Sequence, residues 1–345
     1  MRVSLLILAF LSALPLSAQE QSVRYEASHD AMGTEFTVVA YGRDAKYLGE
    51  VANEVFAEID RLDAQMSNYR AESEISALNR DAARRAVIVE PALFALIQDS
   101  LRYSRETDGA FDITVGPLMR AWGFFRGQGR VPTHAELAEV LERIGYRHVH
   151  LDAERREVRF DREGVELDLG GIAKGYAVDR AVEILRENGV TAALVSSGTS
   201  SLYALGAPPG EQGWKVNIRD PFEAGRAGDV VWLKNYSLSA SGSYERFFTF
   251  EGKTYAHIID PRTGHPVENM LSSAVLAPRA TQSDALSTAF FVLGPQASRI
   301  YLATHPNLAV VFNQPAPARQ TFRRVILRST SFSPPPGSLA EISPP

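Results

Sequence analysis

The chain reads Asp168-Leu-Gly-Gly-Ile-Ala-Lys-Gly175 where a predicted strand gives way to a helix. This junction puts Lys174 in the first turn of that helix, where the backbone dipole is already positive and disfavours a cation. A lysine fits this position if an anion lies between its ammonium group and the free backbone N–H groups. Phosphate is the usual anion at a helix N-terminus. The segment therefore predicts a phosphate site.

A second segment, Ser283-Asp-Ala-Leu-Ser-Thr288, lies more than a hundred residues further along the chain. Asp284 and Thr288 are four positions apart, so in a helix both side chains project from the same face. A carboxylate and a hydroxyl that point together suit a hard cation that keeps part of its water shell, such as Mg²⁺. Phosphate and magnesium together indicate phosphoryl chemistry.

Outward from these segments, the hydrophobic pattern predicts an α+β fold. Strands occur in runs and helices are grouped rather than strictly alternating with them, which favours mostly antiparallel sheets with packed helices. Helices are predicted over 45–66, 91–105, 133–144, 171–188, 283–293 and 295–303, the third opened by a capping box of Thr133 and Glu136. Strands are predicted over 34–40, 147–151, 156–160, 165–168, 192–196, 202–206, 214–219, 229–233, 236–240, 246–250, 254–259, 271–277 and 307–312.

The composition is that of a globular protein with a large core, in one domain or two closely packed ones. The chain has 345 residues, of which 45% are hydrophobic and 22% charged, and a net charge of −5. This mild acidity and the lack of a long Lys/Arg run give no reason to expect nucleic acid as a partner. The chain has no cysteine, which excludes disulfides, thiolate catalysis and cysteine-ligated metals.

The N-terminus has the pattern of a secretory signal peptide. Met1-Arg2 is followed by an apolar run from Val3 to Leu16 and then by Ser17-Ala18, which predicts cleavage of residues 1–18. The run is shorter than the ~20 residues of a transmembrane helix, so an uncleaved anchor is the less favoured alternative. We expect an exported, periplasmic protein that is soluble after cleavage, with no stable membrane insertion. The Ser/Pro-rich end, 329–345, is predicted to be a disordered tail.

Each candidate residue also has an ordinary structural explanation. Asp168 could cap the following helix, and Asp284 could favour a helix start through the dipole. The segment Asp108–Asp112 could be a simple turn. Tyr69 could be a half-buried aromatic, and His257 a core histidine on a strand. Only the joint order of the segments favours a functional interpretation.

That order resembles the FAD:protein FMN transferases, the ApbE family. The resemblance runs from Met32 to about Gly294 and implies one ApbE-like flavin transferase domain over 23–328, with a T-fold-like architecture. Its segments are Met66-Ser-Asn-Tyr-Arg70 with Ser73-Glu-Ile-Ser76 and Asn79, Gly109-Ala-Phe-Asp-Ile-Thr-Val-Gly-Pro117 with Trp122-Gly-Phe124, Asp168 to Gly175, His257-Ile-Ile-Asp-Pro-Arg-Thr-Gly264, and Asp284-Ala-Leu-Ser-Thr288.

Members of this family bind FAD with Mg²⁺ and move its FMN half onto a threonine or serine of an acceptor protein, releasing AMP. The acceptor implied here is a periplasmic or membrane-exposed redox flavoprotein. The residues implied to contact FAD are Met32, Tyr69, Ala110, Phe111, Asp112, Asp168, Lys174 and Ile258. Those implied to hold Mg²⁺ are Gly171, through its carbonyl, Asp284, Ser287 and Thr288. The implied catalytic residues are Asp284 and His257. The resemblance gives His257 the role of base, which suits a histidine because its unperturbed pKa lies near working pH.

Two departures from the family pattern mark a divergent member. Position 287 is often acidic in the family and is serine here, which leaves one fewer negative charge at the metal. The stretch 196–201 holds only Ser, Thr and Gly where the family usually has a Gly-Gly-Asp turn. Two alternatives therefore stay open. One is an FAD pyrophosphatase that uses water and yields FMN and AMP, and the other is a non-catalytic flavin-binding protein.

Overall fold

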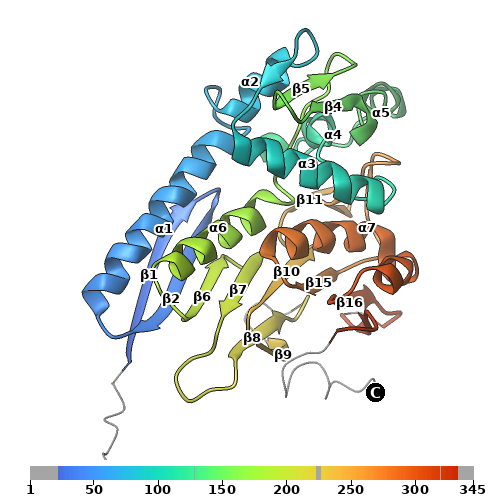
Figure 1. Ribbon diagram of the computed structural model, residues 1–345. Coiled ribbons are helices and arrows are strands. Elements are labelled where there is room, and N and C mark those ends of the chain that lie inside the picture. Colours follow the sequence, from blue (N-terminus) through green and yellow to red (C-terminus); the bar gives the residue numbers. More distant parts are fainter. Residues whose placement is uncertain (1–21, 128, 223–226, 319, 333–345) are drawn as a thin grey trace, which may run out of the picture.

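The computed structural model describes residues 22–127, 129–222, 227–318 and 320–332. An eight-stranded sheet, antiparallel throughout, lies at the centre of this part of the chain, in the order β1-β2-β6-β7-β10-β15-β16-β17 (Figure 1). The predicted α+β class with mostly antiparallel sheets is confirmed. The strands are β1 (Val23–Ala31), β2 (Thr34–Gly42), β6 (Ala192–Ser197), β7 (Ser201–Leu205), β10 (Tyr236–Gly242), β15 (Ser272–Ala277), β16 (Ala309–Pro315) and β17 (Phe322–Arg328).

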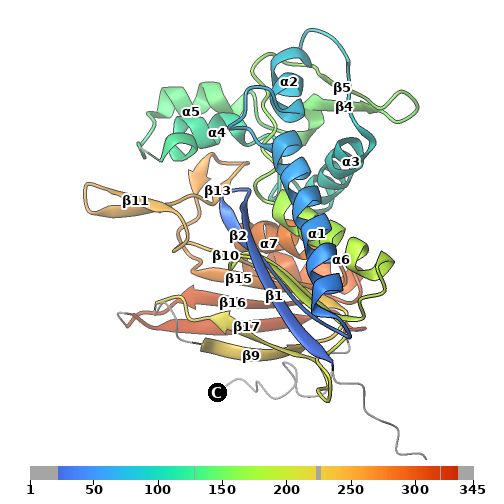
Figure 2. The same cartoon turned by 90° about the vertical axis from the view of Figure 1, so that its left-hand side faces the viewer.

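Three helices cover one face of the sheet (Figures 1 and 2). They are α1 (Ala45–Met66), α6 (Ala173–Glu187) and α7 (Ala280–Thr304). In α1 the apolar residues Val51, Val55, Ile59 and Leu62 recur at helical spacing and are at most 2% exposed. This stripe faces the core, as the sequence pattern predicts.

Helix α7 contains the break that the sequence predicts between two helices. Gly294 has a φ of 70° inside the helix and directly precedes Pro295. Proline cannot supply the N–H that the preceding turn needs, and glycine adopts the positive φ without strain. The helix begins at Ala280, three residues before the predicted start, because a carboxylate from α6 satisfies its first backbone donors.

A hairpin covers part of the opposite face of the sheet. It consists of β8 (Trp214–Arg219) and β9 (Ala227–Leu233). Its residues Trp214 and Val216 belong to a second apolar cluster with Leu238, Leu276 and Val311 from the sheet. The central strands are therefore buried on both faces and lose the alternating pattern of a half-exposed strand. All six residues of β15 are buried.

Shorter elements gather above one end of the sheet in Figure 1. The helices are α2 (Glu74–Asp81), α3 (Pro91–Glu106), α4 (Gly116–Ala121), η1 (Phe124–Arg126), α5 (His134–Leu141) and η2 (Tyr146–His148). The strands are β3 (Val87–Ile88), β4 (Val149–Asp152), β5 (Glu157–Phe160), β11 (Phe247–Phe250), β12 (Lys253–Ala256), β13 (Ile259–Asp260) and β14 (His265–Pro266). The capping box predicted for α5 is confirmed, with Glu136 and Thr133 each accepting a hydrogen bond from the other's backbone N–H.

Some elements differ from the sequence prediction. The sequence prediction does not include β1 and β17, which are the edges of the sheet, although apolar and polar residues alternate along β1. It also misses the short helices α2 and α4. The strand predicted over 165–168 is wrong, because this stretch forms only an isolated parallel bridge, between Glu166 and Val115. No second strand lies beside it to complete a ladder.

The structure describes only part of the two terminal segments predicted from the sequence. The predicted signal peptide lies outside the described residues, as does 333–345 of the predicted tail. Residues 329–332 are described and form a turn, in which the backbone N–H of Ser329 donates to the Leu308 carbonyl (2.9 Å) and the ring of Phe332 packs on Tyr236. None of the helices in the described ranges is long and apolar enough to cross a bilayer.

Candidate active site

A cavity of about 560 Å³ opens where the β1–β2 turn, the end of α1 and the start of α6 meet. Its volume lies within the ~300–1,000 Å³ of typical ligand pockets. Every residue predicted to contact FAD lines it: Met32, Tyr69, Ala110, Phe111, Asp112, Asp168, Lys174 and Ile258. Gly171, His257 and Thr288 line it as well. Two other predicted residues, Asp284 and Ser287, are not part of the lining and are buried.

Helices α6 and α7 cap each other with a carboxylate. Asp284 of α7 accepts a hydrogen bond from the backbone N–H of Gly175 in α6 (2.8 Å). Asp179 of α6 accepts from the backbone N–H groups of Ala280 (2.7 Å) and Thr281 (2.9 Å) in α7. Each acid satisfies donors that a helix N-terminus leaves free and lies at the positive end of the dipole. This reciprocal capping joins the two sequence segments.

Gly175 permits the close approach of the two helices. A Cβ atom at this position would lie 2.2 Å from the carbonyl oxygen of Ala280 and 2.6 Å from the Cβ of Asp284. The carbonyl belongs to the backbone and cannot swing aside as the end of a flexible side chain can. The last glycine of the first segment is therefore required by helix packing.

The environment of Asp284 rules out the alternative in which it favours its own helix start. It lies in the second turn of α7, is 3% exposed, and caps α6 instead. Burial raises the pKa of its carboxyl, while the charge of Lys174 and the hydrogen bond from Gly175 oppose that shift. A bound cation would offset the cost of keeping this buried group ionised.

Lys174 lies in the first turn of α6, as predicted, and lines the cavity. It forms no hydrogen bond or ion pair with another residue of the described ranges. Burial raises the pKa of Asp284 and of Glu245, and the charge of Lys174 lowers both. The Lys174 ammonium group is close enough to affect both acids but pairs with neither. Its N–H donors are therefore available to a ligand. Its place beside a helix N-terminus suits a phosphate.

His257 has a defined tautomer. Its Nδ1 lies 3.1 Å from the backbone carbonyl oxygen of Arg246. Because a carbonyl only accepts, Nδ1 carries the proton of the neutral ring and Nε2 keeps its lone pair. Burial lowers the pKa of His257 to about 4, and the charges of Arg246 and Lys174 act in the same direction. The sequence suggests an unperturbed pKa for His257, and this expectation is wrong. The ring is neutral at pH 7.

The oxygen atoms around Asp284 fit a hard cation. The Oγ1 atom of Thr288 lies 3.5 Å from the position of a Cβ added to Gly171, so this hydroxyl and the Gly171 backbone are neighbours. Carboxylate, hydroxyl and carbonyl oxygens are the donors that Mg²⁺ takes. The hydroxyl of Ser287 is placed differently from these three donors. Its Oγ donates to the Asp284 carbonyl (2.9 Å) and lies 2.8 Å from the Oγ of Ser241. Its oxygen is engaged within the protein.

Asp112 and Asp168 line the cavity while they also stabilise local turns. The Asp112 carboxylate accepts from the Thr114 N–H (2.9 Å), the Thr114 hydroxyl (2.7 Å) and the Tyr146 N–H (2.7 Å). Asp168 accepts from the N–H of Gly170 at 2.8 Å. Burial raises the pKa of both carboxyls, and these hydrogen bonds oppose the shift. The turn explanation for Asp108–Asp112 is thus part of the structure, beside the place of Asp112 in the cavity. The explanation that Asp168 caps the following helix is wrong, because Asp168 bonds to Gly170 and the N-cap of α6 is Ile172, without a side-chain cap.

The segment after α1 adds a free acceptor and an exposed ring. The Asn68 side chain donates to the Leu167 carbonyl (2.9 Å), and its Oδ1 is buried with no partner among the described residues. Tyr69 is 65% exposed and stacks on Phe125, with 4.6 Å between ring centroids. Arg120 covers the Phe125 ring at 4.0 Å. A buried acceptor and an exposed ring at one cavity suit a planar, polar ligand.

Sequence reasoning missed Asp179, Glu245 and Arg246. Asp179 is an acid on the buried face of a helix, which is the signal that could have identified it. Arg246 lines the cavity and accepts the backbone N–H of His257 (3.0 Å). If the strands predicted over 246–250 and 254–259 are paired as a hairpin, Arg246 lies opposite His257.

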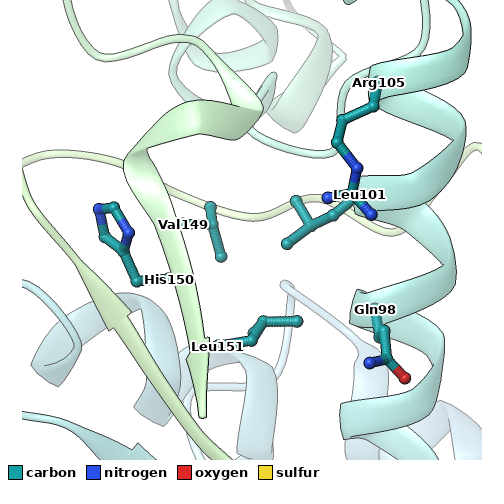
Figure 3. Close-up of a pocket in the computed structure, with 6 residues that line it drawn as sticks. All are labelled: Gln98, Leu101, Arg105, Val149, His150 and Leu151. Carbon is teal, nitrogen blue, oxygen red and sulfur yellow. The ribbon is translucent and has the colours of Figure 1, made fainter. Parts of the chain in front are cut away.

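A second hollow, of about 360 Å³, lies between α3 and β4. Figure 3 shows Leu101 and Leu151 facing each other across it, with His150 on the other side of its strand. Arg105 and Gln98 supply its polar rim. It contains none of the predicted site residues. Across the part of the chain that the structure describes, no group of three or more His, Cys, Asp or Glu forms a metal-binding cluster.

The chain matches the sequence profile of the ApbE family over residues 32–312. It is 34% identical over 304 residues to the FAD:protein FMN transferase of Treponema pallidum, covering 84% of each chain. It is 32% identical to the FAD:protein FMN transferase of Salmonella typhimurium, covering 77% of each. The profile match spans all of the segments that carry the resemblance.

Solved structures share the fold. The ApbE protein from Thermotoga maritima superposes with a TM-score of 0.80 at 32% identity, covering 89% of this chain and 97% of that one. The flavin transferase ApbE from Vibrio cholerae gives a TM-score of 0.78 at 26% identity, covering 90% of this chain and 99% of that one.

Proposed function

Because this chain belongs to the ApbE family, whose curated relatives are FAD:protein FMN transferases, we propose that it moves the FMN half of FAD onto a threonine or serine hydroxyl of an acceptor protein. The reaction releases AMP and uses Mg²⁺. One observation carries the proposal: the hydrogen bond from Gly175 to Asp284 joins the predicted phosphate and metal segments beside a cavity that also contains His257.

In this proposal FAD occupies the cavity as a substrate. Lys174 and the start of α6 bind the pyrophosphate, because an unpaired ammonium group and a helix N-terminus both attract anions. Tyr69 contacts the flavin ring system, and the free Oδ1 of Asn68 accepts a hydrogen bond from the substrate. The other predicted contacts, Met32, Ala110, Phe111, Asp112, Asp168 and Ile258, complete the walls.

The carboxylate of Asp284, the hydroxyl of Thr288 and the carbonyl of Gly171 would hold Mg²⁺, which is consistent with their hard oxygen donors. When bound, the metal neutralises pyrophosphate charge and stabilises the charge that develops at the phosphorus under attack. A single carboxylate gives the protein only part of a coordination shell, so substrate phosphate and water would supply the rest.

His257 takes the proton of the acceptor hydroxyl at Nε2, which its tautomer leaves unprotonated. The acceptor oxygen forms a bond to the phosphorus of the FMN phosphate, and the bond from that phosphorus to the bridging oxygen breaks. AMP leaves with the bridging oxygen. The lowered pKa of His257 keeps the ring neutral at pH 7, so every molecule has a free base, although a weaker one than an unperturbed histidine.

We propose the location from the N-terminal sequence pattern and the partner from the family resemblance. Residues 1–18 direct export, and the mature protein acts in the periplasm on a redox flavoprotein that is periplasmic or exposed at the membrane. The apolar run of this segment is too short for a comfortable membrane span. A direct test is to isolate the protein from a periplasmic fraction and determine its first residue by mass spectrometry. Recovery of intact Met1 would contradict the cleaved signal peptide.

The activity test separates the three candidate functions. The purified protein is incubated with FAD and Mg²⁺, with and without the acceptor protein of the Salmonella typhimurium relative, and AMP, free FMN and protein-bound flavin are measured. Transfer predicts protein-bound flavin in a one-to-one ratio with AMP. AMP with free FMN in the absence of acceptor indicates the pyrophosphatase, and bound FAD without AMP indicates a binding protein.

The base assignment is tested with His257→Ala. We expect transfer to fall by about 10²–10⁴-fold, the range for one general base, while FAD still binds. The melting temperature is measured on the same preparation. A folded variant that still attaches FMN at the parent's rate would remove His257 from the mechanism.

A further inference from the structure

Strand β10 and helix α7 meet along a seam of hydroxyl groups. Beside the cavity, the Oγ of Ser241 lies 2.8 Å from the Oγ of Ser287 and 3.2 Å from the Oγ1 of Thr288. One helical turn further from the cavity, the Oγ of Ser239 lies 2.6 Å from the Oγ of Ser283. All four serines are at most 8% exposed. The same kind of contact thus occurs twice, once at the cavity and once away from it.

A backbone carbonyl fixes the direction of the hydrogen bonds at the cavity. The Ser287 hydroxyl donates to the carbonyl oxygen of Asp284 (2.9 Å), which can only accept. Ser287 has then used its single proton and must accept the proton of Ser241. Ser241 in turn must accept the proton of Thr288. The chain therefore runs from Thr288 through Ser241 and Ser287 to the carbonyl.

We propose that Ser241 is a positioning residue for the metal site, because it takes the Thr288 proton and leaves the Thr288 lone pairs directed at the cavity. The inference rests on the Mg²⁺ site of the proposed function. A hydroxyl binds a cation through a lone pair, so its proton needs an acceptor elsewhere. Hydroxyl chains that run in one direction also polarise each other, which increases the negative charge on the oxygen at the open end.

This arrangement gives Ser287 a different task from the one that the family resemblance implies. Ser287 is fully buried, lies outside the cavity lining, and already has two hydrogen-bond partners. It is the link that orients Ser241, and Thr288 is the hydroxyl that meets the cation. A serine at position 287 can thus support the metal site without contributing a negative charge.

The test compares Ser241→Ala with the matched control Ser239→Ala. The control removes another buried serine hydroxyl from the same strand, which faces the same helix one turn further from the cavity. Both changes are made in a His257→Ala background, so that FAD is not consumed by transfer. The dissociation constant of FAD is measured by flavin fluorescence in Mg²⁺ and in EDTA. The ratio of the two values reports the coupling between metal and FAD without any turnover.

We expect Mg²⁺ to tighten FAD binding in the parent, and Ser241→Ala to reduce this ratio by about 10-fold, as for other residues that orient a metal ligand. Ser239→Ala should leave the ratio within about twofold of the parent, although it should lower the melting temperature about as much as Ser241→Ala does. An unchanged ratio in Ser241→Ala, or an equal loss in both variants, would overturn the proposal. So would a parent whose FAD affinity does not respond to Mg²⁺.

A double-mutant cycle tests whether Ser241 acts through Thr288. Thr288→Val removes the hydroxyl at constant shape and should reduce the ratio at least as much as Ser241→Ala. Adding Ser241→Ala to Thr288→Val should then change it no further, and additive losses would contradict the proposal. Failure of the proposed function is recognised separately, because the enzyme with His257 intact would then release no AMP from FAD and Mg²⁺.

Discussion

The cavity has an inner wall at the junction of α6 and α7, where Thr288 lines it and Gly175 and Asp284 lie buried behind it, and an outer wall formed by Tyr69 and Arg246. The inner wall is mostly buried and bound together by short hydrogen bonds. The residues of the outer wall are exposed, Tyr69 by 65%. Figure 2 shows the same contrast at larger scale, with α6 and α7 packed on the sheet and the β11–β12 hairpin projecting from it.

The difference shows where fold and function share the same atoms. The carboxylate that would hold Mg²⁺ also caps α6, so a change at Asp284 alters stability and chemistry together. Tyr69 contributes little to the core, so it can be changed for binding alone. The predictions below test this division, from the largest expected effect on free energy to the smallest.

Gly175→Ala should have the largest effect on stability. The new methyl group would lie 2.2 Å from the Ala280 carbonyl oxygen, and neither helix can move without breaking the reciprocal caps. We expect the free energy of unfolding to fall by about 3 kcal/mol, the upper end for overpacking. Urea denaturation measures this change.

Gly49→Ala is the matched control, because Gly49 is also helical and the atoms nearest to an added Cβ belong to the Tyr25 side chain, the first at 3.3 Å. Alanine is the better helix former by about 1 kcal/mol, so this variant should be as stable as the parent or slightly more stable. Parent-like stability in Gly175→Ala would show that the α6–α7 junction is looser than the short distances indicate.

The sequence predicts most of the main sheet and its three helices, because their apolar residues repeat strongly. It also predicts most of the cavity, since the lining residues cluster in a few short segments. It cannot predict what a buried acid binds. Asp284 and Gly175 are 109 positions apart, and Asp179 and Ala280 are 101 apart, and no periodicity connects them. Only the packing of α6 on α7 reveals that each helix caps the other.

Asp284→Asn and Asp284→Ala should affect stability in different ways. Burial raises the pKa of Asp284, so its contribution to stability is greatest at low pH and is lost as the pH rises through the folded-state pKa. The ionised form of the group therefore destabilises the metal-free protein relative to the protonated form. Asparagine is neutral and still accepts the Gly175 N–H, so this variant should melt at or above the parent's temperature in EDTA.

Alanine leaves the Gly175 N–H buried without a partner, which costs about 1–3 kcal/mol. Both variants should lose Mg²⁺-dependent AMP release. Thermal unfolding in EDTA and an AMP assay on the same samples separate the two roles of the carboxylate. If asparagine destabilised the protein as much as alanine, the negative charge itself would be required by the fold.

The outer wall should control the pH dependence of transfer. Burial and the charges of Arg246 and Lys174 lower the pKa of His257 to about 4, so the free enzyme should show no loss of kcat/KM between pH 8 and 6 from this residue. Arg246→Gln removes one of these charges, raises the pKa of His257, and should move the acid limb to higher pH by about one unit or less.

Arg70→Gln is the control for that experiment. Arg70 also lines the cavity, but its charge is paired with Asp63 at 2.6 Å and does not contribute to the shift at His257. Its acid limb should coincide with the parent's. A parent profile that already falls near pH 6.5 would mean that His257 has an ordinary pKa, and the assignment of a lowered pKa to this ring would be wrong.

Tyr69→Leu should have the smallest effect on the fold and a clear effect on binding. The ring is 65% exposed and, among the described residues, stacks only on Phe125, so the free energy of unfolding should stay within about 0.5 kcal/mol of the parent. Stacking between aromatic rings contributes about 0.5–1.5 kcal/mol, so FAD affinity should fall by up to about 10-fold.

Tyr69→Phe keeps the ring and should bind FAD as the parent does, which separates stacking from the hydroxyl. Calorimetry with FAD and thermal unfolding on the same samples provide both measurements. If Tyr69→Leu lowered stability as much as Gly175→Ala, the outer wall would belong to the core, and the division between the two walls would not hold.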